Sequence, residues 1–333
     1  MPQALVVREF GGPEAPALED RPELTAGPGE VVVDLRAAAL NRRDLRVIAG
    51  GWPGVAAPLV PGSDGAGVVR SRGAGVSGLA EGDEVVILPA IDWGDDPRVL
   101  GPGFHILGGP SDGTFAEQVR VPAACVFPKP ARLPFEHAAA LPLAGLTAWR
   151  ALFGRGGLTS GQTVLVHGAG AGTSTFAVQF ARAAGARVLV TSGSAGKLAR
   201  ALELGAEAGF DYRADGWEQE VVERTGGGVD LVVDSAGTWG ASAACVRSGG
   251  RIVVFGATVS PTAELDIRGF YFKQIDLVGT MMGSPVDFRA LLRACECQSW
   301  TPIVDSARPL AEAGDALRRM SGGEQFGKLV LTT

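Results

Sequence analysis

The chain has 333 residues, a formal net charge of −6 and a hydrophobic content of 46%. This length suggests about two domains with ample apolar material for their cores. An acidic balance without a basic stripe argues against a nucleic-acid partner. Four scattered cysteines are too few for a disulfide framework. The N-terminus lacks a signal-peptide pattern, and no uncharged apolar run reaches the roughly 18 residues of a membrane helix. We therefore expect a cytoplasmic protein without a membrane partner.

The first part of the sequence has the pattern of a β-rich domain. Short β-branched runs at 29–40, 65–71, 82–88 and 115–122 lie between Gly, Pro and Asp turn signals. Such spacing predicts a small barrel or sandwich. Residues 89–113 form a long turn-rich lobe without periodicity.

The pattern changes near residue 133, where a helical period begins and strands then alternate with helices. The predicted strands are 163–167, 187–191, 229–237, 249–257 and one near 275–280. The predicted helices between the first of them are 173–184 and 195–204. Continuous apolar strands separated by helices predict a parallel sheet that is covered on both faces. After about residue 285, one helix and a last strand close the chain.

The stretch "VLVHGAGAGTS", residues 164–174, joins an apolar strand to a run of small residues that opens a helix. Backbone N–H groups and a helix N-terminus then meet at one place, which suits a pyrophosphate. The dinucleotide fingerprint lacks its last glycine here, and the small Ser174 or Ala171 can fill that position, so the register is open by one residue. The predicted loop residues are Gly168, Gly170, Ala171, Gly172, Thr173 and Ser174.

The second strand of this unit predicts which dinucleotide binds. No Asp or Glu lies between Val188 and Leu202, although a reader of the ribose 2′-hydroxyl needs one. Ser192, Ser194, Lys197 and Arg200 can all donate to a 2′-phosphate. We therefore predict NADP(H) rather than NAD(H); the alternative for the two cationic residues is a solvated helix face.

Several stretches together resemble the medium-chain dehydrogenase/reductase superfamily. They include "PLVPGSDGAGVV", "DGTFAEQV", "ALPLAGLTAWRAL", "GGRIVVFGA" and "GEQFGKLVL", and they span nearly the whole chain. The resemblance implies an α/β protein with a Rossmann-type doubly wound parallel sheet domain and a β-rich GroES-like barrel domain. The catalytic GroES-like domain is expected over residues 1–130 and the cofactor-binding domain over 131–284, with 285–333 returning to the catalytic domain.

The resemblance also indicates whether the chain has a catalytic zinc site. Zinc-dependent members hold zinc at positions that match Asn41, Ser63 and Leu143 here, and none of these is an effective zinc ligand. The sequence is therefore similar to the zinc-free branch that contains the NADPH:quinone oxidoreductases. That branch implies hydride transfer to a quinone or an α,β-unsaturated carbonyl, whose conjugation spreads the developing charge without a metal.

The resemblance places Asn41 and Asp44 at the nicotinamide end, with Arg43 as an unusual donor nearby; these are the predicted catalytic residues. Asn41 has the alternative of capping a helix, and Asp44 that of pairing with Arg43 or Arg46. The resemblance adds to the cofactor-binding set Thr147, Tyr212, Ala236, Gly237, Phe255, Gly256 and Lys328. Thr147 has the alternative of a buried helix residue.

Relatives in this superfamily pair through the edge strand of the cofactor domain, here near residues 275–283, so we expect a homodimer. Two other functions stay open. One is an alcohol or aldehyde dehydrogenase/reductase of the same superfamily, and the other is a protein that binds NADPH without turnover.

Overall fold

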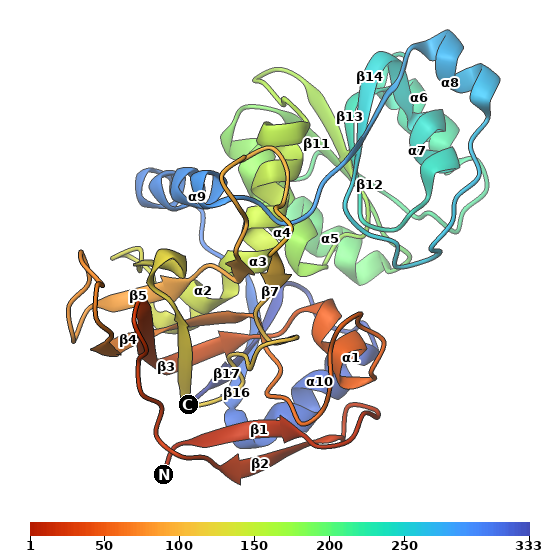
Figure 1. Cartoon of the computed structure of the whole chain (residues 1–333). Coiled ribbons are helices and arrows are strands. Elements are labelled where there is room, and N and C mark those ends of the chain that lie inside the picture. Colours follow the sequence, from red (N-terminus) through yellow and green to blue (C-terminus); the bar gives the residue numbers. More distant parts are fainter. The chain divides into compact units, whose positions relative to one another are not determined.

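The computed structural model describes all 333 residues, which form two compact units. Unit 1 consists of Met1–Ala144 and Ser284–Thr333, and unit 2 of Gly145–Gly283. Both termini therefore lie in unit 1 (Figure 1). Unit 1 extends beyond the predicted limit of residue 130, because helix α2 (Phe135–Ala140) packs on strands of its sheet. None of the helices is long and apolar enough to cross a lipid bilayer.

Unit 1 is built on a seven-stranded sheet with the strand order β16-β17-β3-β4-β5-β9, in which β8 also pairs with β3. Four strands match the predicted runs: β3 (Glu30–Ala39), β4 (Asp64–Arg72), β5 (Glu84–Ile87) and β8 (Gln118–Pro122). The others are β9 (Val126–Pro128), β16 (Val304–Pro309) and β17 (Lys328–Thr332). β17 pairs antiparallel with β3, so the C-terminal segment completes this sheet, as predicted.

Smaller elements surround the sheet of unit 1. Two hairpins are present: β1 (Gln3–Val7) with β2 (Pro16–Asp20), and β6 (Ala90–Ile91) with β7 (His105–Ile106) in the turn-rich lobe. The helices are α1 (Arg42–Ile48), α9 (Pro285–Cys297) and α10 (Ala313–Ser321). Short 3₁₀ turns cover Ala123–Cys125 and Leu310–Glu312. Leu317 of α10 packs into a buried cluster with Ile48, Phe115 and Leu331, which ties α1 and α10 to the sheet.

Unit 2 is a six-stranded parallel sheet with the order β12-β11-β10-β13-β14-β15. Its strands are β10 (Thr163–Val166), β11 (Arg187–Thr191), β12 (Ala208–Phe210), β13 (Val229–Asp234), β14 (Val246–Val254) and β15 (Asp276–Gly279). β14 begins and ends three residues before the predicted range of 249–257. β15 is an edge strand, as the predicted pairing requires.

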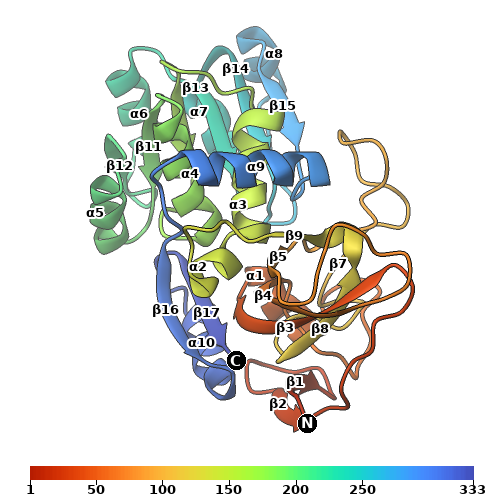
Figure 2. The same cartoon turned by 90° about the vertical axis from the view of Figure 1, so that its left-hand side faces the viewer.

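Helices cover both faces of this sheet (Figure 2). They are α3 (Pro142–Trp149), continued by a π-helical turn over Arg150–Arg155, then α4 (Gly172–Ala183), α5 (Ala195–Glu203), α6 (Trp217–Thr225), α7 (Trp239–Cys245) and α8 (Ile267–Lys273). Trp217 and Cys245 share one core with Leu165 and Ile252 of the sheet. The strand order reverses between β10 and β13, so the crossover helices on the two sides of this point lie on opposite faces. Ligands of doubly wound sheets bind at such a switch point, outside the carboxyl ends of the strands.

Candidate functional site

The glycine loop lies at the carboxyl end of β10, at the switch point. Gly168 and Gly170 have φ values of 76° and 94°, a region that glycine enters without steric cost. Ala171 is the N-cap of α4, and Gly172, Thr173 and Ser174 form its first turn. The Ser174 hydroxyl donates to the His167 carbonyl at 3.0 Å, which fastens the start of the helix to the end of the strand. The strand, the glycine loop and the helix N-terminus therefore have the predicted arrangement, and their contact with a phosphate remains a prediction.

A buried series of hydrogen-bonded side chains crosses the carboxyl ends of β10, β11 and β13 beneath this loop. His167 follows β10, and its Nδ1 and Nε2 lie 2.9 Å from Thr191 Oγ1 and 3.1 Å from Ser242 Oγ. The Ser242 hydroxyl donates to Asp234 Oδ2 at 3.0 Å, so Ser242 accepts from Nε2–H, and Nδ1 accepts from Thr191. Burial lowers the pKa of His167 below its ordinary value, which keeps the ring neutral.

Asp234 extends this series of hydrogen bonds into the loop after β13. Its Oδ1 accepts from the backbone N–H of Ala236 at 2.7 Å and of Gly237 at 2.9 Å, and Oδ2 accepts from Thr238 at 3.1 Å. At the other end, the Gly168 N–H donates to Thr191 Oγ1 at 3.4 Å. One continuous chain therefore fixes the glycine loop and the Ala236–Gly237 turn in relation to each other.

The residues after β11 form the predicted 2′-phosphate region. Ser192 is buried and its Oγ accepts from the Ser194 N–H at 3.2 Å, while Ser194 is the N-cap of α5 and accepts from the Lys197 N–H. Both hydroxyl protons stay available for donation to a phosphate oxygen. Lys197 is half-buried in the first turn of α5, and Arg200 is exposed one turn later.

Tyr212 covers the glycine between these two serines. A Cβ on Gly193 would lie 2.8 Å from Tyr212 Oη and 3.2 Å from Arg213 Nε, so a larger residue there would displace the ends of these two side chains. Arg213 holds Asp211 through two bonds of 3.0 and 2.8 Å, which fixes its guanidinium beside Gly193. Sequence reasoning selected Tyr212 and missed Arg213, although Arg213 is the next residue in the chain.

The other predicted cofactor residues of unit 2 also lie at strand ends. Phe255 and Gly256 follow β14, and a Cβ on Gly256 would lie 2.5 Å from the Ser235 carbonyl oxygen. The structure thus brings the loops after β10, β11, β13 and β14 to one edge of the sheet. Thr147 lies buried in α3, in agreement with its alternative as a buried helix residue, and its contact with a cofactor remains a prediction.

Unit 1 contains a second, separate polar cluster. The Lys328 ammonium at the start of β17 donates to Asn41 Oδ1 at 2.7 Å and to Asp64 Oδ2 at 2.9 Å. The Asn41 amide also donates to Asp64 Oδ2 at 2.9 Å, and the Leu143 N–H donates to Asp64 Oδ1 at 2.8 Å. Lys328 is only 3% exposed and Asp64 is fully buried. The predicted cofactor residue Lys328 is therefore engaged within unit 1, and a cofactor role for it remains untested.

Arg43 connects three segments of unit 1. Its guanidinium donates to Ser63 Oγ at 2.6 Å, to the Leu107 carbonyl at 3.1 Å and to the Gly109 carbonyl at 3.4 Å. The Trp52 ring lies over the guanidinium, with 4.6 Å from Cζ to the ring centroid. Burial lowers the pKa of Arg43, but it stays charged because its ordinary value is so high.

Asp44 is fully buried beside Arg43, with 3.7 Å between its Oδ1 and the guanidinium. Its Oδ2 accepts from the Asn41 N–H at 2.7 Å at the start of α1. Burial raises the pKa of Asp44 to about 6, against the opposing effect of Arg43. Asn41 occupies the N-cap of α1, in agreement with its capping alternative, and its amide belongs to the Asp64 cluster, while its role at the nicotinamide end remains a prediction.

Two family models match the chain. The alcohol dehydrogenase GroES-like domain matches residues 27–131, within unit 1. The zinc-binding dehydrogenase model matches residues 172–296, which begins at α4 of unit 2.

Individual relatives cover almost the whole chain. A zinc-type alcohol dehydrogenase-like protein of Schizosaccharomyces pombe is 36% identical over 315 residues, which are 91% of each chain. A quinone oxidoreductase of Rattus norvegicus is 29% identical over 99% of this chain and 97% of its own. The crystal structure of an NAD-dependent alcohol dehydrogenase aligns with a TM-score of 0.93 at 39% identity, covering 99% of both chains.

The zinc that one family model names does not fit the residues of this chain. The three positions that resemble zinc ligands carry an amide, a hydroxyl and an aliphatic side chain, in place of thiolate or imidazole. Ser63 Oγ already accepts from the Arg43 guanidinium, and Asn41 Oδ1 from the Lys328 ammonium. A divalent cation there would face two buried positive charges, and no group of three His, Cys, Asp or Glu side chains lies elsewhere in the structure with metal-site geometry.

Proposed function

The chain belongs to the medium-chain dehydrogenase/reductase superfamily, and on that premise we propose that it is an NADPH-dependent reductase of quinones or α,β-unsaturated carbonyls that works without a metal. The observation that carries the proposal is the pair of sites just described. The first site is the glycine loop together with the end of strand β11, which carries hydrogen-bond donors and no carboxylate. In the second site, Arg43 donates to Ser63 and Lys328 donates to Asn41, the residues at two of the positions that resemble zinc ligands.

The proposed cofactor is NADP(H), and the residues of unit 2 fit it. The glycine loop and the N-terminus of α4 suit the pyrophosphate, and the hydroxyls of Ser192 and Ser194 with the cations of α5 suit the extra phosphate. Two charge-assisted bonds of about 1.5–3 kcal/mol each would give a preference of a hundredfold or more over NAD(H). The 39% identical structure is named as an NAD-dependent enzyme, so NAD(H) is the competing cofactor for this chain.

The reduced nicotinamide supplies a hydride, an electron pair with its hydrogen, to the β-carbon of an enone or to a quinone. The acceptor then carries a negative oxygen, and a proton from water or a side chain completes the product, which is a saturated carbonyl compound from an enone or a quinol from a quinone. In unit 1 the guanidinium of Arg43 is the predicted donor for the acceptor oxygen, and Asn41 is predicted to line the nicotinamide end. Conjugation spreads the developing charge, so this donor has less charge to stabilise than at a simple ketone.

For the proton we propose Asp44, one of the predicted catalytic residues of this end. With its pKa raised to about 6, Asp44 is half protonated near pH 6 and about one tenth protonated at pH 7. The catalytic roles of Asn41, Arg43 and Asp44 are part of this proposal.

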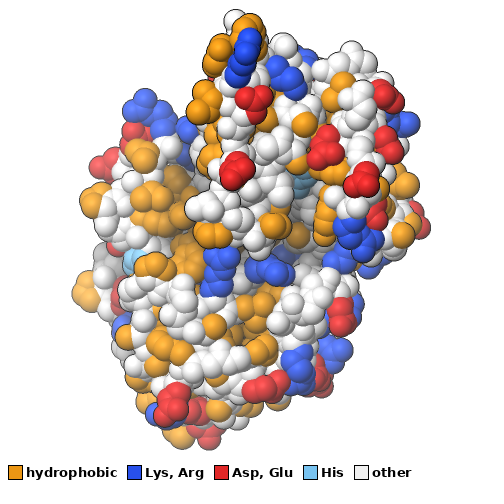
Figure 3. Space-filling model, turned by 90° about the vertical axis from the view of Figure 1, so that its right-hand side faces the viewer, with side chains coloured by type: hydrophobic (Ala, Val, Ile, Leu, Met, Phe, Trp, Pro, Cys, Tyr) orange, Lys and Arg blue, Asp and Glu red, His pale blue; other side chains and the backbone are white.

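We also propose a homodimer formed at the β15 edge of unit 2. β15 has one unpaired edge, and the neighbouring helix α8 exposes large apolar side chains: Ile267, Tyr271 and Phe272. Figure 3 shows hydrophobic side chains gathered around this end of the unit, with Lys and Arg among them. Sedimentation of the purified protein tests this proposal.

A dehydrogenase of alcohols or aldehydes is the second candidate, favoured by the names of the yeast relative and of the aligned structure. Steady-state rates with NADPH and NADH, each against a quinone, an enone and an aldehyde, separate the candidates. The proposal expects NADPH oxidation with the quinone or the enone, unchanged by a zinc chelator. NADH preference with aldehyde turnover supports the second candidate, and NADPH binding without turnover of any acceptor supports a binding protein.

A further inference from the structure

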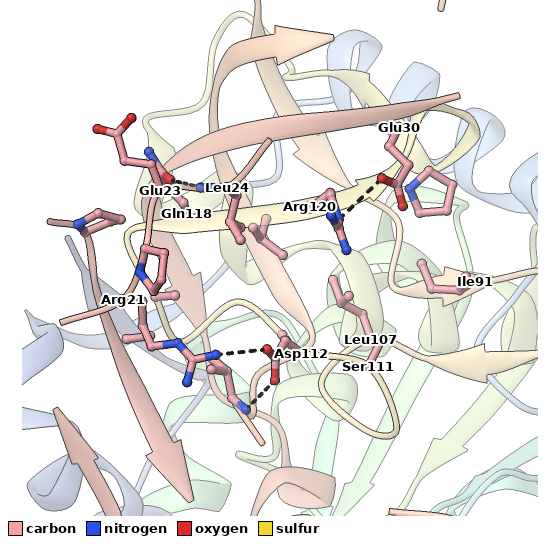
Figure 4. A pocket seen from close by; sticks show the side chains of 18 of the residues that line it. Arg21, Glu23, Leu24, Glu30, Ile91, Leu107, Ser111, Asp112, Gln118 and Arg120 are labelled. Carbon is pink, nitrogen blue, oxygen red and sulfur yellow. Dashed lines mark hydrogen bonds and ion pairs between the residues drawn. The ribbon is translucent and has the colours of Figure 1, made fainter. Parts of the chain in front are cut away.

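A cavity of about 540 Å³ lies within unit 1 (Figure 4). Its wall comes from the N-terminal hairpin, the loop that precedes β3, strand β8 and the β6–β7 lobe. Neither Asn41, Arg43, Asp64 nor Lys328 lines it. Its volume lies within the range of cavities that bind small organic molecules.

The floor of the cavity is apolar. Six of its apolar lining residues are less than 5% exposed: Ala4, Val60, Ile91, Leu107, Ala116 and Val119. The half-buried Leu24 adds to this surface at the rim. A flat or branched hydrocarbon body can therefore lose water on entering.

The charged residues of the wall are predominantly acidic. Arg21 and Arg120 face four carboxylates, so the wall has a formal charge of −2 with His105 neutral. The two arginines already have carboxylate partners: Arg21 lies 3.8 Å from Asp112, and Arg120 lies 3.3 Å from Glu30 (Figure 4).

Asp92 differs from the other carboxylates of the wall. Glu23 pairs with Arg70 at 3.1 Å, whereas Asp92 has neither an ion pair nor a hydrogen bond. Asp92 follows the floor residue Ile91 at the end of β6, with a φ of 52°. The wall also contains a buried hydroxyl without a partner, Ser111 Oγ.

We propose that this cavity binds an organic cation, with an apolar ring on the floor and one ammonium group facing Asp92. The negative wall attracts a cation and repels an anion, and burying an apolar ring against the floor is favourable because that surface leaves water. Asp92 gives the ammonium group a carboxylate that no cation of the protein already pairs. The proposal does not depend on the proposed function, because it concerns a different cavity.

Three probes with the same ring test it by calorimetry at pH 7: 2-naphthylmethylammonium, 2-naphthylmethanol and 2-naphthoate. We expect the ammonium to bind about threefold or more tighter than the alcohol, and the naphthoate to bind more weakly than both.

A matched pair of variants and one rim variant test whether the ammonium preference arises in this cavity. Asp92→Asn keeps a residue type that tolerates positive φ, and should bring the ammonium down to the affinity of the unchanged alcohol. Asp95→Asn removes one exposed charge from the same lobe outside the cavity wall and should leave the ammonium preference intact. Leu24→Trp, which fills the rim, should weaken all three probes.

Equal affinity of the ammonium and the alcohol, no binding of any probe, or the same loss in Asp92→Asn and Asp95→Asn would overturn the proposal. None of these results bears on NADPH oxidation, which is measured separately.

Discussion

Replacing Arg43 by methionine removes the cation that crosslinks α1, Ser63 and the 107–109 segment. The variant loses donated bonds of 2.6, 3.1 and 3.4 Å and leaves Asp44 as a buried carboxylate without its neighbouring charge. Breaking a buried pair by removing one partner costs about 3–5 kcal/mol. Arg42→Met is the matched control, because Arg42 is exposed in the same turn of α1, and it should cost within about 0.5 kcal/mol.

The cost of Arg43→Met should depend on pH through Asp44. A carboxyl whose folded pKa is raised to about 6 binds more protons in the folded than in the unfolded state, so stability falls as pH rises through that region. Without Arg43 the pKa of Asp44 rises further, and the fall in stability continues to higher pH. The variant should therefore be destabilised more at pH 8 than at pH 5.

Urea unfolding of the wild type, both arginine variants and Arg43→Met/Asp44→Asn measures these free energies. The added Asp44→Asn should recover part of the loss, because the remaining side chain is then uncharged. A cost for Arg43→Met equal to that of Arg42→Met, or one that shrinks from pH 5 to pH 8, would refute the reasoning.

Other predictions concern both units. Ser192→Asp should shift the affinity ratio of NADPH to NADH by about a hundredfold toward NADH, because a carboxylate repels the extra phosphate, and fluorescence titration measures this. Lys197→Gln should weaken NADPH about tenfold and NADH little, with Arg224→Gln on α6 unchanged as the control; equal losses for both cofactors would contradict this. His167→Asn should destabilise the protein less at pH 5 than at pH 8 in urea titrations, because the lowered pKa of His167 costs the wild type stability in acid. Lys328→Met should cost about 3–5 kcal/mol of unfolding free energy, because Asp64 loses its buried cation; a cost under about 1 kcal/mol would contradict it.

The parallel sheet and the glycine loop were predictable because their signals are local. Continuous apolar strands such as β10 and β11 are followed by turn residues and helices, and this pattern marks a covered parallel sheet. The positive φ angles of Gly168 and Gly170 explain why glycine stands there. β16 was not predicted, since its short polar-rich stretch does not stand out from the neighbouring loops. α10 was missed although its buried residues Ala313, Ala316, Leu317 and Met320 have helical spacing.

The polar contacts were not predictable because they join distant parts of the chain. Lys328 reaches Asn41 across 287 positions, and only the pairing of β17 with β3 brings them together. His167 appeared in the sequence as an isolated histidine, and its partners come from β11 and α7. Burial on neighbouring strands, rather than any spacing, gives these residues their chemistry.

The most direct test of the account follows hydrogen from the cofactor to the acceptor. NADPH that carries deuterium at the transferred position is incubated with the protein and an enone in the presence of a zinc chelator, and the product is analysed by mass spectrometry. The account predicts one deuterium at the β-carbon of the saturated ketone. Turnover that stops with the chelator, or NADPH that binds and passes deuterium to no enone or quinone, would contradict it.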